Sequence, residues 1–350
     1  MSISRRNLVK GITIAGTSLA FEHRMHAQAM STAYDVKVIA ATTSFSANVA
    51  LNNRRTAAGY SWDGQRQVPT LWNERFGLHG LETAAAPGFI QAINNFDQAV
   101  GFVQDGNKVT PLLWSESAAI LLDDSNYNSL ESTPPVPVSI NDQGIIAGDG
   151  SDAVRWKIDN GRSSSDHVPY PKVRLTTVTS NGHIGGISRI PDHAAIILWS
   201  DDAVSTFAIP EPFAGSPTLI TETVLSSGED MIYVSIIAGD IDETGFAHEV
   251  LTLRVRDGQL LPNDALSGRP VLLPIATNAS EDVVGYLDDE SDLIAAIWSQ
   301  GNLTVLSDAI DPQLGLSITR SVDVNDHGDI LSFASDRHGV EYSTILTPVR

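Results

Sequence analysis

The segment Ile140-Asn141-Asp142-Gln143-Gly144-Ile145-Ile146-Ala147-Gly148 has the pattern of a short β-hairpin. An aliphatic strand end is followed by Asn and Asp, then by Gly, and then by a second aliphatic run that reaches another Gly. Asn, Asp and Gly suit this turn because they tolerate the positive φ angles of tight hairpins. The segment therefore predicts two antiparallel strands joined by a short turn.

Variants of this hairpin recur along the chain. Copies begin at Leu51, Ile93, Ile140, Val178, Leu225, Ala276 and Val324. An aromatic or aliphatic marker follows each copy, at Trp72, Trp114, Trp156, Trp199, Leu253, Trp298 and Leu346. Subtracting these numbers gives intervals of 42, 42, 43, 54, 45 and 48 residues. A period of about 40–50 residues predicts a repeat array such as a β-propeller.

Each unit has room for four short strands, A to D. We expect strand A to end at the Asn, strand B to end at the second Gly, strand C to carry the Trp, and strand D to follow a small turn. This predicts an all-β fold, a seven-bladed β-propeller with four strands per blade. Six or eight blades remain alternatives if the fifth unit is miscounted. The Trp residues should pack between blades, because large aromatic side chains dominate core burial.

The two ends of the repeat array predict how the ring closes. The last unit stops at residues 342–347, its strand C, and a spare strand-like run precedes the first unit at residues 34–40. The N-terminal strand should therefore complete the last blade. Such closure removes exposed sheet edges, which are prone to aggregation.

The first 29 residues have the pattern of a twin-arginine export signal. Arg5 and Arg6 precede an apolar stretch from Gly11 to Phe21, and residues 27–29 form a small-x-small cleavage site. We therefore predict a signal peptide over residues 1–29, a single propeller domain over residues 30–350, and a protein exported in folded form to the periplasm or the medium.

Composition narrows the classes of partner and cofactor. The chain has no Cys, which excludes disulfides and Cys-ligated iron–sulfur clusters. Its net charge of -20 disfavours nucleic acid and anionic membranes, and it favours solubility, cations or basic partners. No apolar run reaches the length of a membrane span, so we expect no membrane insertion. We expect a monomer, and a divalent metal stays an alternative.

The repeated pattern Ile-Asn-x-x-Gly-x-Ile-x-Gly, followed by Leu-Trp, resembles the HAF-type extracellular repeats of bacterial exported proteins. The resemblance covers nearly all of the chain after the signal segment. It implies a secreted, propeller-like protein, and it supplies no catalytic residues.

The strand order divides the loops between two ends of the ring. The A-to-B and C-to-D turns lie at one end, and the longer B-to-C and D-to-A loops lie at the other. Binding residues concentrate on irregular loops of a rigid scaffold, so we expect the site at the B-to-C end. The catalytic candidates there are His193, His248, His338, Asp192, Asp242 and Glu243. The binding candidates are Trp62, Arg66, Arg189 and Arg337.

Two functions fit these residues. The chain lacks the Gly-x-Ser-x-Gly, phosphate-loop and His-Glu-x-x-His motifs. The leading hypothesis is a noncatalytic module that binds a small molecule, a glycan or a protein partner, with Trp62 as an apolar platform. The alternative is a hydrolase or lyase. It would use His and carboxylate residues at the funnel mouth, where His can act as acid, base or metal ligand.

Overall fold

Short strands joined by tight turns follow one another along the chain in the computed structural model. The structure describes residues 34–83, 86–115, 118–122, 134–150, 153–170, 173–190, 193–200, 203–208, 220–225, 232–238, 249–256, 259–262, 272–289 and 292–349. The predicted signal segment lies outside these residues.

The described strands form seven antiparallel four-stranded sheets, six of which consist of four consecutive strands. The first three of these sheets are β2 (Phe45–Leu51), β3 (Ala57–Trp62), β4 (Gln67–Asn73) and β5 (Gly77–Gly80); β6 (Gly88–Ile93), β7 (Ala99–Asp105), β8 (Lys108–Ser115) and β9 (Ala118–Leu121); and β10 (Val136–Ile140), β11 (Ile145–Asp149), β12 (Val154–Asp159) and β13 (Arg162–His167). The next three are β14 (Val173–Val178), β15 (Ile184–Ile190), β16 (His193–Ser200) and β17 (Ala203–Ala208); β18 (Ile220–Leu225), β19 (Ile232–Ala238), β20 (Glu249–Arg256) and β21 (Gln259–Pro262); and β22 (Leu272–Thr277), β23 (Val283–Asp289), β24 (Asp292–Ser299) and β25 (Asn302–Val305).

The remaining sheet joins the two ends of the chain. It combines β1 (Tyr34–Ala41) with β26 (Leu316–Val324), β27 (Ile330–Asp336) and β28 (Glu341–Pro348), and β1 pairs antiparallel with β28 from Tyr34 opposite Pro348 to Ala41 opposite Tyr342. Two short 3-10 helices, η3 (Leu306–Ala309) and η4 (Pro312–Leu314), connect β25 to β26. The N-terminal strand thus completes the last blade, as the sequence predicts.

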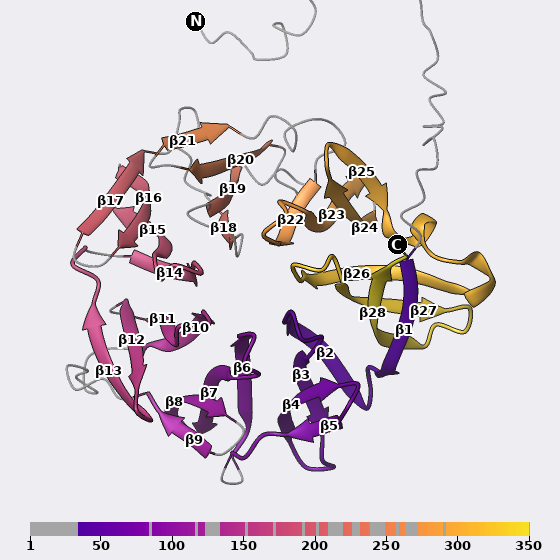
Figure 1. Cartoon of the computed structure of the whole chain (residues 1–350), viewed down its shortest axis with the longest axis horizontal. Coiled ribbons are helices and arrows are strands. Elements are labelled where there is room, and N and C mark those ends of the chain that lie inside the picture. The colour runs from indigo at the N-terminus through magenta and orange to yellow at the C-terminus, as the bar shows by residue number, and fades with distance from the viewer. Residues whose placement is uncertain are drawn as a thin grey trace, which may run out of the picture. The chain divides into compact units, whose positions relative to one another are not determined.

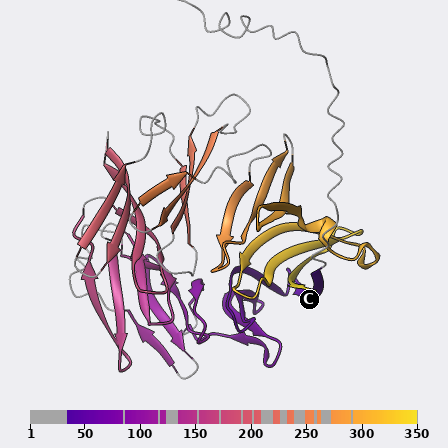
Figure 2. The same ribbon diagram turned by 45° about the horizontal axis from the view of Figure 1, so that its top comes forward.

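The sheets stand around a central axis as the blades of a β-propeller (Figures 1 and 2). The innermost strands contact one another in the order β2, β6, β10, β14, β18, β22 and β26, and β26 contacts β2. The predicted all-β propeller with four strands per blade is therefore confirmed. Among the described residues, no helix has the length and apolar character needed to cross a membrane.

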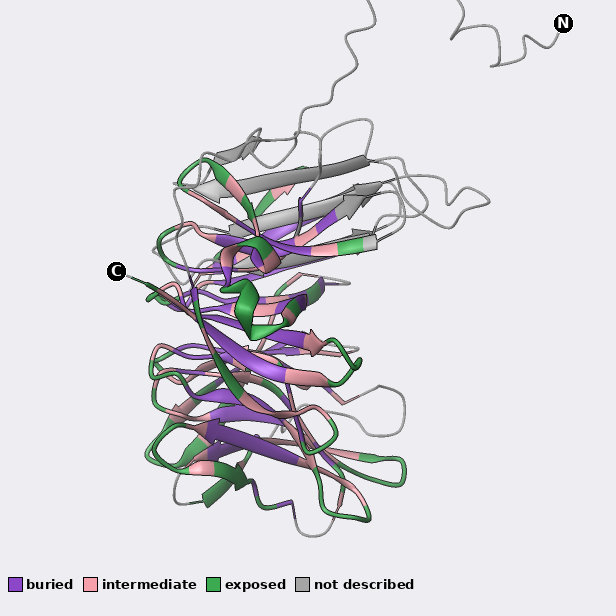
Figure 3. Ribbon diagram, turned by 90° about the vertical axis from the view of Figure 1, so that its right-hand side faces the viewer, coloured by how far each residue is buried: buried purple, intermediate pink, exposed green. Residues whose placement is uncertain are grey.

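The repeated Trp residues pack between blades. Trp114 on β8 shares a hydrophobic cluster with Ala58 and Leu71 of the preceding blade, and its indole N–H donates to the carbonyl of Glu82 at 2.8 Å. Trp156 and Trp199 also lie in clusters that include residues of the blade before them. Figure 3 shows this burial along the strands and the exposure of the turns.

Two details of the predicted units are wrong. Strand B does not end at the repeated Gly but continues beyond it, as β3 does from Gly59 to Trp62. In the fifth unit, Val255 pairs with Ile232 in the register that other blades use for the Trp, so Val255 occupies the marker position and Leu253 does not. Leu253 is expected there because it is a large aliphatic residue at about the right interval in the sequence. The pairing of β19 with β20 is set by backbone hydrogen bonds, which the residue pattern does not encode.

The repeated Gly of strand B permits a bulge in strand A. The pairing of β6 with β7 shifts by one residue between Ile90 and Ala92, and a Cβ atom on Gly101 would collide with the carbonyl oxygen of Phe89. A larger shift, between Ser46 and Ala50, brings Gly59 against the backbone of β2. The fifth unit has Val234 at this position, and its β18–β19 pairing runs without a shift. The last blade keeps a shift between Ser321 and Asp323 with Ser332 at this position. The Gly therefore accompanies the bulge in most blades, but the bulge also forms without it.

Replacing Gly101 with Ala should destabilise the protein by about 2–3 kcal/mol, because the new methyl group meets a backbone atom that cannot rotate away. Chemical denaturation measures the loss. Gly80→Ala is the matched control, since its Cβ would meet only a Val68 methyl group at 3.3 Å. Equal stability of the two variants would contradict the close approach.

Candidate functional site: the central hollow

The A-to-B turns share one backbone conformation. In the first blade, the N–H of Asn52 donates to Thr56 O at 3.1 Å, and the N–H of Arg55 donates to Asn52 O at 3.0 Å. This is a type I turn followed by a left-handed residue. That left-handed position holds Gly144, Gly182 or Gly328 in three blades, and Arg55, Asp97 or Glu281 in three others.

The repeated Asn of each turn links its blade to the next one. Its side-chain oxygen accepts the N–H groups two and four residues later, as in Asn94 with Phe96 and Gln98. Its side-chain amide donates to the backbone carbonyl of the equivalent residue in the following blade. These links run from Asn278 to Asn325, Asn325 to Asn52, Asn52 to Asn94, Asn94 to Asn141 and Asn141 to Thr179, at 2.8–3.1 Å. We call this set the Asn belt.

A second layer of hydrogen bonds runs beside the Asn belt. The residue after each Asn offers its side-chain oxygen to the backbone N–H of the preceding blade. The pairs are Ala279 to Asp326, Asp326 to Asn53, Asn53 to Asn95 and Asn95 to Asp142, at 2.7–2.8 Å. The motif Asn-Asn/Asp therefore joins blades through both of its side chains.

Charged residues at the left-handed position add a third kind of link. Arg55 Nε donates to Asp329 Oδ2 at 2.8 Å, and the side chain of Asp329 is fully buried. Burial opposes the ionisation of Asp329, but the hydrogen bonds from Arg55 and Asn325 hold its pKa below the usual value. Arg54 pairs with Asp97 of the next blade at 3.0 Å. The strain of a non-glycine residue at positive φ is thus offset by contacts between blades.

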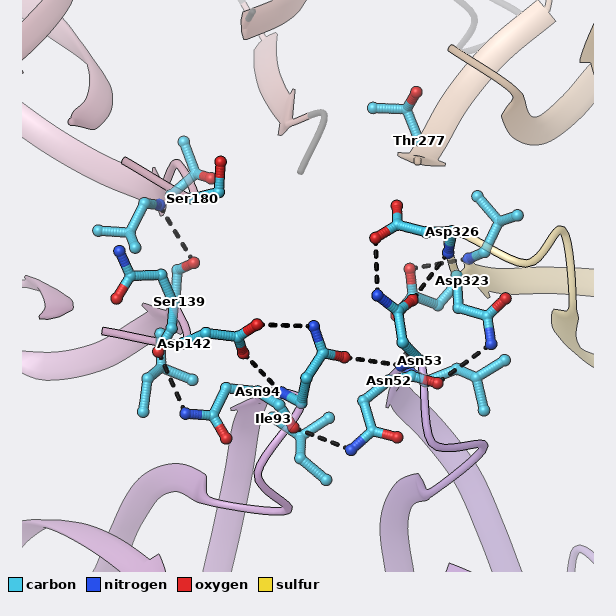
Figure 4. A pocket seen from close by; sticks show the side chains of 18 residues that line it. Asn52, Asn53, Ile93, Asn94, Ser139, Asp142, Ser180, Thr277, Asp323 and Asp326 are labelled. Carbon is cyan, nitrogen blue, oxygen red and sulfur yellow. Dashed lines mark hydrogen bonds between the residues drawn. The ribbon is translucent and has the colours of Figure 1, made fainter. Parts of the chain in front are cut away.

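The inner strand ends and turns enclose a hollow of about 210 Å³ (Figure 4). We call it the central hollow. The described residues that line it are Leu51, Asn52, Asn53, Ile93, Asn94, Asn95, Ser139, Ile140, Asn141, Asp142, Thr177, Val178, Ser180, Thr277, Asp323, Val324, Asn325 and Asp326. They come from the ends of β2, β6, β10, β14, β22 and β26 and from the turns that follow. The central hollow therefore opens at the A-to-B end of the ring.

Amides, hydroxyls and carboxylates dominate the polar part of this lining. Asp142, Asp323 and Asp326 bring negative charge, and none of the described lining residues is Lys, Arg or His. Such a wall offers hydrogen bonds to hydroxyl groups and favours positive over negative charge.

Asp323 on β26 has the most altered acidity in the central hollow. Its two carboxylate oxygens accept the N–H groups of Leu51 at 2.7 Å and Val324 at 2.8 Å. Loss of hydration raises the pKa of Asp323 to about 7, the two backbone hydrogen bonds oppose this rise, and the nearby Asp326 adds to it. A carboxyl group that titrates near neutral pH is suited to proton transfer or to pH-dependent binding.

The residues predicted at the B-to-C end are dispersed in the part of the chain that can be described. Trp62, at the end of β3, is 61% exposed. Arg66 bonds to Asp63, to Thr83 Oγ1 at 2.9 Å and to the carbonyl of Ala86 at 2.6 Å, so it ties two loops of the same end together.

The other predicted site residues divide into three groups. Arg337 and His338 are exposed in the β27–β28 turn, where Arg337 Nε lies 3.2 Å from His338 Nε2. Arg189 lies on β15 and His193 begins β16, with only their backbones described. Asp192, Asp242, Glu243 and His248 lie outside the described residues. Within the described ranges, no three His, Asp or Glu residues gather in a metal-binding arrangement.

Sequence reasoning missed the central hollow because it treated the A-to-B turns as purely structural. The signal was available in the repeat itself. Thr277 and Asp323 replace the residues that most units carry at the same positions of strand A. Aligning the units of the repeat with one another is enough to reveal both departures.

Comparisons with known proteins support the fold. No protein-family model matches the chain, and no curated protein matches it. The solved structure of an oligogalacturonate lyase from Vibrio parahaemolyticus aligns with a TM-score of 0.56 at 10% identity, covering 90% of this chain and 97% of that one. A virginiamycin B lyase from Staphylococcus aureus aligns with a TM-score of 0.52 at 13% identity, covering 90% and 100%. At such identities the likeness shows the propeller fold alone.

The stability of the protein should depend on Asp323 between pH 4 and 7. The pKa of this carboxyl is raised from 3.8 to about 7 in the folded state, so the unfolded chain releases the proton first as the pH rises. Wild type should therefore lose stability relative to Asp323→Asn across this window, with no further change above pH 8. Thermal unfolding at each pH measures the difference. The exposed Asp105→Asn variant should parallel wild type, and a pH-independent gap for Asp323→Asn would contradict the raised pKa.

Proposed function

We propose that this protein is an exported, noncatalytic propeller that binds a small hydroxylated molecule in the central hollow. The observation that carries this proposal is the lining: six blades contribute amide, hydroxyl and carboxylate groups to one enclosed space. A concave site with a few convergent polar groups among apolar neighbours is the usual form of a small-molecule site. Leu51, Ile93, Ile140 and Val178 supply those apolar neighbours.

The rigidity of the wall supports binding at this end. Four lining residues, Asn52, Asn94, Asn141 and Asn325, are held by hydrogen bonds within their turns and to the next blade. A ligand then meets groups that are already oriented, which lowers the entropic cost of binding. The exposed Trp62 at the opposite end remains a second candidate contact for a glycan or protein partner.

Ser180→Trp should abolish ligand binding, because Ser180 is an exposed residue that lines the central hollow and an indole would fill the space. A panel of monosaccharides and polyols that includes D-glucose and D-sorbitol, observed by ligand NMR, should contain compounds that bind wild type and lose at least tenfold in affinity with this variant. Asn302→Trp, at the exposed start of β25, is the control. Unchanged binding by Ser180→Trp would place the site elsewhere, and a panel without any binder would contradict the proposal.

An enzyme is the second candidate function, and the raised pKa of Asp323 favours it. A carboxyl group near neutrality can act as a general base, the role that a lyase or hydrolase requires. A binder from the panel should be recovered unchanged after hours with the protein if the chain is a binding module. Conversion by wild type, but not by Asp323→Asn, would establish the enzyme instead.

Export through the N-terminal segment is also part of the proposal. Changing Arg5 and Arg6 to Lys should retain a reporter fused to residues 1–33 in the cytoplasm, because the twin-arginine pair is the recognised element of such signals. Cell fractionation measures the distribution, with Lys10→Arg as the control. Equal export of the double variant would contradict this route.

A further inference from the structure

The first blade carries an exposed tryptophan at its B-to-C end. Trp62 ends β3 and is 61% exposed, whereas the other five Trp residues of the chain are buried or partly buried. A large aromatic side chain that stays in water gives up the stabilisation that burial provides. The packing of the blade therefore does not explain why a Trp stands at this position.

The repeat shows that the fold does not need an aromatic residue there. Trp62 lies five residues after Ala57, which pairs with the Trp of strand C. The same count in the other six units gives Gln104, Ser151, Arg189, Ile237, Asp288 and Ser335. Polar residues dominate this set and Trp occurs once, so Trp62 is a departure from the repeat that backbone pairing does not require.

The turn that follows Trp62, residues 63–66, is held in one conformation. Asp63 Oδ1 accepts the N–H groups of Gln65 and Arg66, both at 2.9 Å, and the N–H of Asp63 donates to Arg66 O at 3.2 Å. The hydrogen bonds from Gln65 and Arg66 hold the pKa of Asp63 below its usual value. The carboxylate therefore stays ionised, and keeps these bonds, throughout the neutral range.

Arg66 fixes this turn to the connection between β5 and β6. Its Nη1 donates to Thr83 Oγ1 at 2.9 Å and to Ala86 O at 2.6 Å, and Thr83 is buried. The backbone that carries the indole of Trp62 is thus anchored before any ligand arrives, which lowers the entropic cost of binding. A rigid aromatic side chain on an anchored turn is a common contact residue of binding surfaces.

The surroundings of Trp62 suit a sugar ring better than a protein partner. Its neighbours in the turn, Asp63 and Gln65, are polar and exposed. Among the described residues, the other large apolar side chains exposed at this end belong to other blades, at Leu121, Leu293 and Val340. A protein interface has a continuous apolar core. A pyranose needs one flat aromatic surface for its C–H groups and polar groups for its hydroxyls.

We propose that Trp62 and the turn of residues 63–66 form a second binding site, for a β-linked glucan chain, at the end of the ring opposite the central hollow. The indole stacks on the C–H face of a glucose unit whose hydroxyl groups are equatorial. Gln65, exposed in the same turn, supplies an amide for hydroxyl groups at the edge of that unit. This site goes beyond the proposed function, because it uses no residue of the central hollow.

Fluorescence titration with cellohexaose, a linear β-linked glucose oligomer, tests the site directly, because Trp62 is the exposed fluorophore. Binding should shift the emission of wild type to shorter wavelength as the indole leaves water, and Trp62→Ala should remove this shift. In calorimetry, Trp62→Ala should weaken cellohexaose about tenfold or more, and Trp62→Phe, which keeps an aromatic ring, about threefold or less. Phe76→Ala is the matched control. Phe76 is also 61% exposed but lies in the β4–β5 turn at the opposite end, so this variant should match wild type.

The outcomes separate this site from the central hollow. Ser180→Trp should leave cellohexaose binding unchanged, and a loss in that variant together with normal binding by Trp62→Ala would overturn the second site. Equal weakening by Trp62→Ala and Phe76→Ala would also overturn it, since any exposed aromatic residue would then serve. Equal affinity for D-sorbitol, which has hydroxyl groups but no ring face, would contradict stacking. Absence of cellohexaose binding would overturn the inference, while the panel of monosaccharides and polyols tests the central hollow on its own.

Discussion

The hydrogen bond from an Asn side-chain amide to the backbone carbonyl of the next blade is the interaction on which this ring depends. It is buried, as between Asn94 and Asn141, and losing either partner would leave a buried polar group with fewer hydrogen bonds. The same side chain also shapes the turn of its own blade. One residue therefore both shapes the local hairpin and links it to the neighbouring blade.

The Asn belt is most important where the chain ends come together. Asn325, in the blade that contains β1 and β28, donates to the carbonyl of Asn52 in the blade formed by β2 to β5. In the second layer, Asp326 and Asn53 join the same two blades. With no Cys in the chain, disulfides contribute nothing to this closure. The ion pair between the partly exposed Arg55 and the buried Asp329 lies at the same junction.

A motif repeated for structural reasons makes departures from it informative. The wall of the central hollow is built from the strand ends and turns that hold the ring together, so most lining residues have a structural task. Thr277 carries a hydroxyl group where the other units have an aliphatic residue, and Asp323 carries a carboxylate where they have small neutral residues or Val. Function is therefore to be sought in these departures and not in the motif.

Much of the fold could be predicted from the residue pattern, because the Asn-containing turn defines where each strand A ends and the Trp marks strand C. The role of residues 34–40 in closing the ring could be predicted because the last unit ends at its strand C, and a spare strand precedes the first unit. The register of the fifth unit could not be predicted, since Val255 carries no aromatic signal. The end of the ring that holds the hollow was also missed. The sequence predicts long loops at the B-to-C end, but the described B-to-C turns are short, as between Asp105 and Lys108. The hollow depends instead on how closely six A-to-B turns approach the axis.

The most direct test of the account is a double-mutant cycle between Asn53 and Asp326, which are 273 residues apart in sequence. Asn53 Nδ2 donates to Asp326 Oδ2 at 2.7 Å, and the N–H of Asp326 donates to Asn53 Oδ1 at 2.8 Å. Denaturation of the two Ala variants and of the double variant should give a coupling free energy of about 1 kcal/mol or more. A coupling indistinguishable from zero would contradict the claim that these turns hold the first and last blades together.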